Sequence, residues 1–407
     1  MGTEFLKIKE SDDAKKIIGN LFNKCYASKI EEIDVEDSYN RVLYEDIYSL
    51  IDFPSFDKAL KDGFAIKAED SYGTNEENPN TIDVIDFLEA GSTTNKVVEK
   101  GKCIEISTGA ALPDGADGIA MVEFCYKHDD KVDILKSITP YQDVARKGSD
   151  MKEGDLLLKQ KEVLNPGKIG VLLSQGFKTV DVYKKPVVGV ISTGNELISQ
   201  DEDLNYGKIY DVNSEMIKSS AISYGAIGKS LGIVKDDYDI LKKKIESSLE
   251  EVDILICSGG TSAGLGDVLK HVLDEIGEVF IHGISVQPGK PTIAAIVNGK
   301  VVIGLPGNPV SAIVIFNVFV APQIAKLSGY DINQNKKTIK AKLSKKIHSP
   351  LGRLQYQMVR LKNGLVEPIF KDSGAIFSLS EADGYVKVLK SIELVDVGEV
   401  VEVNLFN

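Results

Sequence analysis

The stretch VDILICSGGTSAG (residues 252–264) decides the fold, because an apolar run leads directly into a glycine-rich turn. Short apolar runs bounded by turn residues are typical of strands that are buried on both faces. Two further strands of this kind are predicted at residues 187–191 and 300–303, and each also leads into a glycine-containing loop. Recurrent strands of this type indicate a sheet whose two faces are both covered.

Helical patterns separate these strands between residues 185 and 330. Asn298-Gly299 is a two-residue hairpin signal between two of the strands. Strands that alternate with helices predict a central parallel α/β sheet with helices on both faces. The predicted helices cover residues 211–224, 238–249, 267–276 and 309–328, and the additional strands cover residues 230–234, 279–281 and 292–297.

The whole chain of 407 residues predicts a multidomain α/β plus β protein. An amphipathic helix at residues 11–26 belongs to a mixed α/β domain built from residues 1–53 and 143–184. Short strands and turns indicate a β-rich inserted domain at residues 54–142. The α/β domain follows at residues 185–330. Period-two alternation near the end of the chain indicates a small C-terminal β-barrel at residues 337–407.

The charge and cysteine patterns exclude several classes of protein. The net charge is −13, with 48 basic and 61 acidic residues and no long block of one sign, which argues against sequence-independent nucleic-acid binding. The four cysteines form no C-x-x-C pair, so a transition-metal site made of Cys and His is not expected.

The apolar run at residues 310–320 is too short to span a bilayer and is better explained as a buried helix. The N-terminus has no signal-peptide core. We therefore expect a cytoplasmic protein with no nucleic-acid and no membrane partner.

Four loops of the α/β domain follow predicted strands, where open parallel sheets bind their ligands. Glycine lets backbone N–H groups approach an anion, and a following helix N-terminus adds a favourable partial charge. Lys290 would add a full charge at a phosphate, while Glu196 and Asp267 would hold magnesium. One such loop is more often only a tight turn, but four at strand ends indicate an anion-binding site. The loops are STGNE (residues 192–196), SGGTSAG (258–264), QPGKP (287–291) and GLPGNPVS (304–311).

These loops resemble the signature loops of the molybdopterin-binding domain, in the order found in the MoeA family of molybdopterin molybdenumtransferases, which includes the E domain of gephyrin. The resemblance covers nearly the whole chain. Further matching segments are DGFA (residues 62–65), TGA (108–110), LPDGAD (112–117), GSD (148–150), KDSG (371–374) and ADG (382–384).

The resemblance implies a role in molybdenum-cofactor biosynthesis. Molybdate is inserted into adenylylated molybdopterin, and AMP is released with the help of Mg2+. It also implies a homodimer whose cleft lies between domains of opposite subunits, and contact with molybdopterin adenylyltransferase.

The resemblance further implies the roles of individual residues. The implied catalytic carboxylates are Asp62, Asp150, Glu196, Asp236 and Asp267, with Glu196 and Asp267 as magnesium ligands; Asp237 is an alternative to Asp236. The implied substrate-binding residues are Thr108, Gly109, Thr193, Gly194, Ser258, Gly259, Gly260, Ser262, Lys290, Pro306, Gly307, Asn308, Ser311 and Ser373.

The chain departs from the family pattern at four positions. Lys61 and Phe64 flank an Asp-Gly pair where methionine and tyrosine are usual, Leu265 replaces an acidic residue, and Gln287 replaces a lysine. These departures leave open a paralogue with weakened catalysis that acts as a pterin-binding or scaffold protein. A molybdopterin adenylyltransferase is a second alternative, although the regions on both sides of the α/β domain argue against this single-domain type.

Overall fold

The computed structural model describes residues 8–259, 268–331 and 338–406, and the chain divides into two compact units. Unit 1 consists of Met1–Glu45, Lys161–Asn165 and Thr179–Asn407, and unit 2 consists of Asp46–Gln160 and Pro166–Lys178. The finer division into four domains stays a prediction.

The core of unit 1 is a six-stranded sheet in the order β16-β13-β17-β21-β20-β18. The first four strands are parallel. Strand β20 pairs antiparallel with β21, and β18 pairs antiparallel with β20, so β20 runs against the first four strands and β18 runs in their direction. The predicted α/β fold class is confirmed, but the sheet is mixed rather than parallel throughout. The hairpin at Asn298 and Gly299 explains this, because both residues have positive φ (49° and 75°) and the tight turn reverses the chain. The strands are β13 (Val187–Thr193), β16 (Ile227–Val234), β17 (Ile254–Ser258), β18 (Gly277–His282), β20 (Ile293–Val297) and β21 (Lys300–Leu305).

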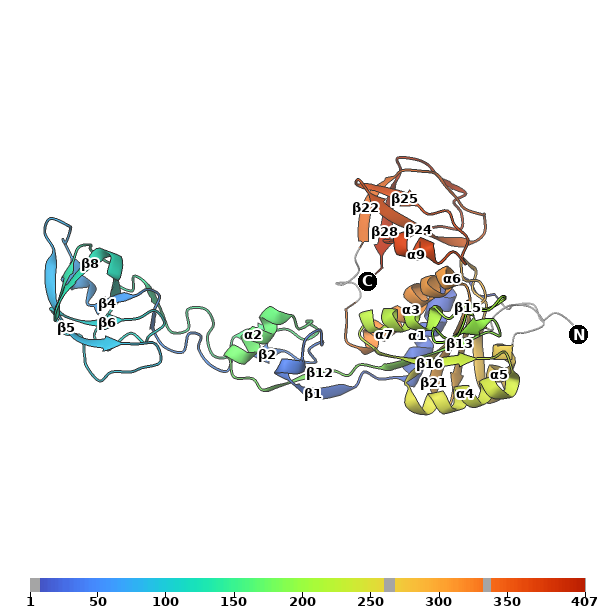
Figure 1. Cartoon of the computed structure of the whole chain (residues 1–407), viewed down its shortest axis with the longest axis horizontal. Helices are drawn as coiled ribbons and strands as arrows, with labels where there is room; N and C mark the ends of the chain where they lie inside the picture. The colour runs from blue at the N-terminus through green and yellow to red at the C-terminus, as the bar shows by residue number, and fades with distance from the viewer. Residues whose placement is uncertain (1–7, 260–267, 332–337, 407) are drawn as a thin grey trace, which may run out of the picture. The chain divides into compact units, whose positions relative to one another are not determined.

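Helices cover both faces of this sheet (Figure 1). Alternate residues of β17 show the reason: Ile254 and Ile256 enter one apolar core, while Leu255 and Cys257 enter the other. Two helices, α4 (Tyr238–Glu251) and α5 (Val268–Ile276), supply the second core. The first core is shared by α1 (Ser11–Cys25), α3 (Asn213–Ser223), α6 (Pro309–Ile315), the π-helical turn η4 (Phe316–Val320) and α7 (Ala321–Leu327).

The helical stretch Pro309–Leu327 is long and apolar enough to cross a membrane by length and composition, but 78% of its most apolar window is buried inside the protein. Phe316 and Phe319 are almost fully buried in the first core. The predicted buried helix in this region is therefore confirmed.

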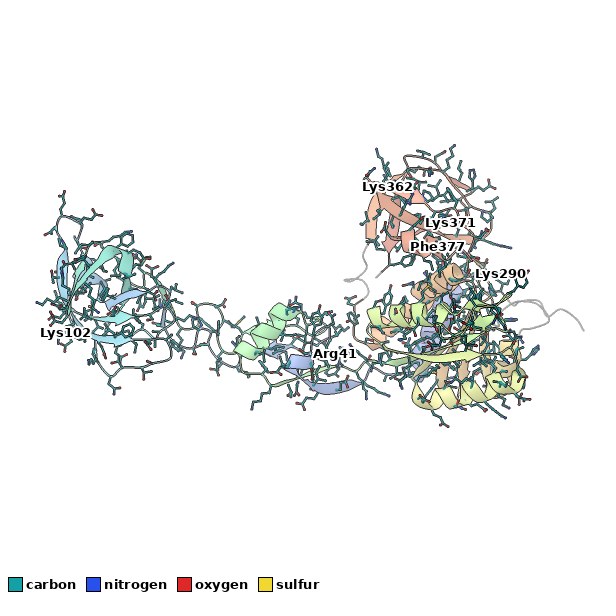
Figure 2. The ribbon with its side chains drawn as sticks, in the orientation of Figure 1. Arg41, Lys102, Lys290, Lys362, Lys371 and Phe377 are labelled. Atoms are coloured by element: carbon teal, nitrogen blue, oxygen red, sulfur yellow. The ribbon has the colours of Figure 1, made fainter. Side chains whose placement is uncertain are left out.

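The C-terminal strands of unit 1 form a barrel. Strand β24 (Leu354–Lys362) pairs with both β25 and β26, so the order β24-β25-β22-β28-β26 closes on itself. The predicted small barrel is confirmed. Strand β19 (Val286–Gln287) pairs in parallel with β24, which joins the barrel to the α/β part. The other barrel elements are β22 (Thr338–Leu343), β25 (Leu365–Pro368), helix α9 (Phe377–Glu381), β26 (Gly384–Val388) and β28 (Val400–Leu405). Lys371 and Phe377, labelled in Figure 2, belong to this C-terminal part, and the Phe377 side chain is exposed.

Unit 2 contains a second six-stranded sheet in the order β7-β4-β6-β5-β9-β8, which confirms the β-rich N-terminal region. Its two faces bury separate clusters, with Ile104 in one and Cys103 in the other. A smaller part of the unit contains β2 (Ile47–Tyr48), β11 (Leu156–Leu158) and α2 (Pro166–Ser174). The sheet strands are β4 (Gly63–Ile66), β5 (Asn80–Leu88), β6 (Lys102–Ile106), β7 (Gly118–Met121), β8 (Cys125–His128) and β9 (Lys131–Ile134).

Candidate functional site

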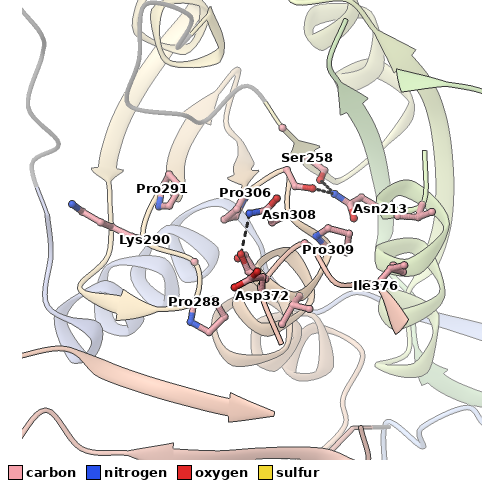
Figure 3. A pocket seen from close by; sticks show the side chains of 18 of the residues that line it. Asn213, Ser258, Pro288, Lys290, Pro291, Pro306, Asn308, Pro309, Asp372 and Ile376 are labelled. Atoms are coloured by element: carbon pink, nitrogen blue, oxygen red, sulfur yellow. Dashed lines mark hydrogen bonds between the residues drawn. The ribbon is translucent and has the colours of Figure 1, made fainter. Parts of the chain in front are cut away.

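Unit 1 contains a cleft of about 1420 Å³ at the carboxyl ends of β13, β17 and β21. One wall consists of the loops that follow these strands, and another consists of barrel residues, among them Arg353 and residues 369–374 (Figure 3). The location agrees with the general rule that open α/β sheets bind ligands where their parallel strands end.

Twelve of the predicted site residues line this cleft. They come from six separate segments that the fold brings together: Thr193, Gly194, Glu196, Asp236, Ser258, Gly259, Lys290, Pro306, Gly307, Asn308, Ser311 and Ser373. Gly260, Ser262 and Asp267, as well as Leu265, lie outside the described residues. The roles assigned to all these residues stay predictions.

The glycines of two loops do not offer the N–H groups that the sequence led us to expect. The Gly194 N–H donates to the Val234 carbonyl (3.2 Å), and the Gly259 N–H donates to the Leu305 carbonyl (3.0 Å). At Gly259 the glycine instead permits a close backbone approach, because a Cβ would lie 2.2 Å from the Thr193 carbonyl oxygen and φ is +102°. For these two glycines the expectation of direct N–H contact with an anion is therefore corrected.

Glu196 and Asp236 form the acidic side of the cleft. Burial, and then the negative charge of Glu196, raise the pKa of the Asp236 carboxyl above its ordinary value. Asp236 Oδ1 is buried and has no hydrogen-bond partner. A buried carboxylate oxygen without a donor, beside a second carboxylate, fits a hard divalent cation such as magnesium. Within the described ranges, no group of three His, Cys, Asp or Glu residues has metal-site geometry.

Lys290 also lines the cleft, from the QPGKP loop between β19 and β20. The residue is partly buried, and within the described part of the chain its ammonium group has no ion pair or hydrogen bond. Lys371, by contrast, lies 3.5 Å from Glu381. An uncompensated ammonium group is well suited to bind a phosphate or another oxyanion.

Two hydrogen bonds, here called the clasp, join Ser373 to the loop and helix start at residues 308–310. The Asn308 Nδ2 group donates to Ser373 Oγ (2.9 Å), and the Val310 N–H donates to the Ser373 carbonyl (3.1 Å). Pro309 starts α6 directly after Asn308, so the clasp lies at the N-terminus of a buried helix. Figure 3 shows Asn308 and Asp372 facing each other across this contact. The contact holds the loop that contains Ser373 against the site.

Sequence reasoning missed Asn213, which lines the cleft and is only 8% exposed. Its Nδ2 group donates to Ser258 Oγ (2.9 Å) and to the Gly307 carbonyl (2.7 Å). Its neighbour Asp211 accepts hydrogen bonds at the start of α3. The sequence did contain a sign of the helix start, since Asp is a typical residue at the N-terminus of a helix. Nothing in the sequence indicated that this helix start lines the cleft.

The remaining predicted site residues belong to unit 2. Asp62 Oδ1 accepts hydrogen bonds from the Thr108 N–H (2.6 Å) and the Thr108 hydroxyl (2.9 Å). These bonds hold the pKa of the Asp62 carboxyl below its ordinary value. Gly109 follows in the same turn with φ +86°, and Asp150 is exposed. The structure thus brings together Asp62, Thr108 and Gly109 within this unit.

Comparisons with known proteins match the chain from one end to the other. The MoeA N-terminal region (domain I and II) matches residues 9–176, a probable molybdopterin binding domain matches residues 189–326, and the MoeA C-terminal region (domain IV) matches residues 340–406. A Methanocaldococcus jannaschii protein named for molybdopterin biosynthesis is 38% identical over 387 residues, which are 93% of this chain and 92% of that protein.

Two further relatives agree with this match. The molybdopterin molybdenumtransferase of Staphylococcus epidermidis is 33% identical over 400 residues, covering 96% of this chain and 94% of that protein. The crystal structure of a molybdopterin biosynthesis MoeA protein from Pyrococcus horikosii superposes with a TM-score of 0.85 at 36% identity, covering 98% of this chain and 100% of the other. The chain therefore belongs to the MoeA family of molybdopterin molybdenumtransferases.

Proposed function

We propose that this chain inserts molybdate into adenylylated molybdopterin and releases AMP. The observation that most supports this function is the convergence, in one cleft, of the Glu196–Asp236 pair, the strand-end loops and Lys290, whose ammonium group has no ion pair with any described residue. Such a cleft can hold a phosphorylated ligand at its basic side and a cation at its acidic side.

In this proposal the residues of the cleft bind and orient the substrates. Lys290 binds an oxyanion, either a phosphate of the pterin or molybdate, and hydroxyl and amide groups of the loops orient it. Glu196 and Asp236, together with Asp267 from the sequence, would hold Mg2+. When bound, Mg2+ would neutralise phosphate charge and polarise the phosphoanhydride. Hydrolysis of that bond gives AMP and the pterin phosphate, whose two dithiolene sulfurs bind molybdenum.

A homodimer is part of the proposal. In unit 2, α2 buries Leu172 but leaves Val171 and Leu173 exposed, at 38% and 47%. Tyr48 of β2 and Leu156 of β11, which are paired in register, are also exposed. Exposed apolar side chains on a protein surface are candidates for a protein contact. A second copy of the chain is the proposed partner there, and contact with molybdopterin adenylyltransferase is a further proposed interaction.

The proposed activity is tested by mixing purified protein with adenylylated molybdopterin, molybdate and Mg2+ and measuring AMP. We expect AMP release by the wild type and a loss of about 100-fold in Glu196→Gln, because that variant lacks a full ligand charge. The control is Glu246→Gln, an exposed position on α4 with the same chemical change. Equal AMP release by the wild type and Glu196→Gln would contradict the assigned role.

The same protein samples test the two alternatives. A scaffold protein with an inactive pocket would show no magnesium-dependent affinity for adenylylated molybdopterin in calorimetry. An adenylyltransferase would convert ATP and metal-free molybdopterin into the adenylylated pterin. We expect binding in the first experiment and no product in the second.

A further inference from the structure

Three strands of unit 1 end at a small set of buried polar side chains that includes the helix start at Asp211 and Asn213. Asp211 is 5% exposed, and its Oδ1 accepts hydrogen bonds from the Asn213 N–H (3.0 Å), the Ser214 N–H (3.2 Å) and the Ser192 hydroxyl (2.8 Å). Ser192 belongs to β13. Asp211 therefore fixes the first turn of α3 to the end of this strand.

Asn213 extends this connection to the next two strands. One amide nitrogen donates to Ser258 Oγ, at the end of β17, and to the Gly307 carbonyl, in the loop after β21. Figure 3 shows both bonds. A carbonyl oxygen only accepts hydrogen bonds, so the nitrogen must face Gly307 and the flipped orientation of the amide is excluded.

This orientation decides what the Ser258 hydroxyl can do. Because the Asn213 nitrogen has only protons to offer, Ser258 Oγ must act as the acceptor in their 2.9 Å contact. The hydroxyl proton of Ser258 is thus directed elsewhere, and among the described residues it has no acceptor. Ser258 lines the cleft. The neighbouring Gly259 N–H already donates to the Leu305 carbonyl, so of these two groups at the strand end it is the Ser258 hydroxyl that can donate to a ligand.

We propose that Asp211 and Asn213 are positioning residues that preset the Ser258 hydroxyl as a hydrogen-bond donor to a phosphate oxygen of the pterin substrate. Neither residue reacts. This inference rests on the proposed function for the identity of the ligand. A donor oriented before binding costs no reorganisation when the phosphate arrives, and a hydrogen bond to a charged oxygen is stronger than one to a neutral acceptor.

The test is a double-mutant cycle on the full chain, with adenylylated molybdopterin titrated in Mg2+ by calorimetry. The single variants are Asn213→Leu and Ser258→Ala. Leu keeps the branched shape of Asn, with methyl groups in place of the amide oxygen and nitrogen, and adds no negative charge that would itself repel phosphate. We expect Ser258→Ala and Asn213→Leu each to raise the dissociation constant about tenfold or more. Adding Asn213→Leu to Ser258→Ala should raise it by less than about threefold, because the hydroxyl that Asn213 orients is already absent.

A control and a second variant keep this test interpretable. Ser248→Ala removes another buried serine hydroxyl, one without a hydrogen-bond partner on α4, and should leave the affinity unchanged. If Asn213→Leu fails to fold, Asn213→Ala replaces it in the same cycle. Steady-state AMP release adds a second readout: KM should rise with little change in kcat, as expected for an interaction made equally with bound substrate and transition state.

The outcomes separate this inference from the proposed function. An Asn213 effect that remains at its full size in the Ser258→Ala background would overturn the inference, even if the enzyme releases AMP normally. A non-additive cycle in a protein that binds the pterin but releases no AMP would support the inference and contradict the proposed activity. A wild type that does not bind the pterin would contradict both.

Discussion

Asp236 has a carboxyl group whose protonation depends on its neighbours in the cleft. Burial and Glu196 raise its pKa above the ordinary 3.8. Between the unfolded and the folded pKa the native state therefore binds more protons than the unfolded chain, so stability falls as pH rises through this window and stays lower above it. Asp236→Asn removes this penalty. We expect the variant to be more stable than the wild type to urea at pH 7 without metal, with a smaller difference as the pH approaches 4.

Magnesium should reverse this ranking of stability. Binding to the native state stabilises it, so Mg2+ should raise the melting temperature of the wild type but not that of Asp236→Asn. Glu246→Gln is the control and should respond like the wild type. Equal magnesium stabilisation of wild type and Asp236→Asn would contradict the assignment of Asp236 to the cation site.

Asp62 shows the opposite shift. Its two hydrogen bonds from Thr108 lower its pKa, so their stabilising effect is present above the unfolded pKa and is lost as pH falls through the folded pKa. We expect the Thr108 amide proton, followed by NMR, to titrate with a midpoint below 3.8, the ordinary value for Asp. Asp62→Asn should abolish this titration. A midpoint at or above the ordinary value would contradict the assigned hydrogen bonds.

The ends of β13 and β17 approach each other so closely that only glycine fits at position 259. Gly259→Ala would bring a Cβ within 2.2 Å of the Thr193 carbonyl oxygen, so we expect a loss of about 2 kcal/mol or more in urea unfolding. Gly232→Ala is the matched control: φ is +90° there, but nothing lies within 4 Å of the added Cβ. It should cost only about 1 kcal/mol. Equal losses would show that the close approach contributes nothing.

Most helices and strands of the α/β part were predictable because their patterns are strongly periodic. The predicted helix at residues 211–224 is observed as Asn213–Ser223, and the predicted strand at 252–257 is observed as Ile254–Ser258. The antiparallel pairings of β20 and β18 were harder to predict from the sequence. Asn298-Gly299 predicted the hairpin correctly, but the alternation of strands and helices favoured an all-parallel sheet, because periodicity reports burial and not strand direction.

The candidate site was predictable where glycine, proline and charge mark a loop. Lys290, Glu196 and Asn308 were found in this way, and they now line one cleft. Asn213 was not found, because its importance arises from contacts with Ser258 and Gly307, which are 45 and 94 positions away. A sequence pattern contains no information about such partners. The sequence also could not show that the Gly194 and Gly259 N–H groups are already used.

For the assembled protein, the exposed apolar side chains of α2 predict a dimer. We expect the wild type to sediment as a dimer and Leu173→Lys to shift toward the monomer, because a buried charge in an apolar contact is costly. Leu204→Lys is the control: that leucine is also exposed (58%) but belongs to unit 1. A monomeric wild type, or a Leu173→Lys variant that remains fully dimeric, would contradict the proposed contact.

We propose that this cleft couples the release of AMP to the insertion of molybdenum. The most direct test counts both products in one reaction: AMP by chromatography, and molybdenum bound to the isolated pterin by mass spectrometry. We expect equal molar amounts of the two products from the wild type and a parallel loss of both in Glu196→Gln. AMP release without molybdenum on the pterin, or no AMP from the wild type, would contradict it.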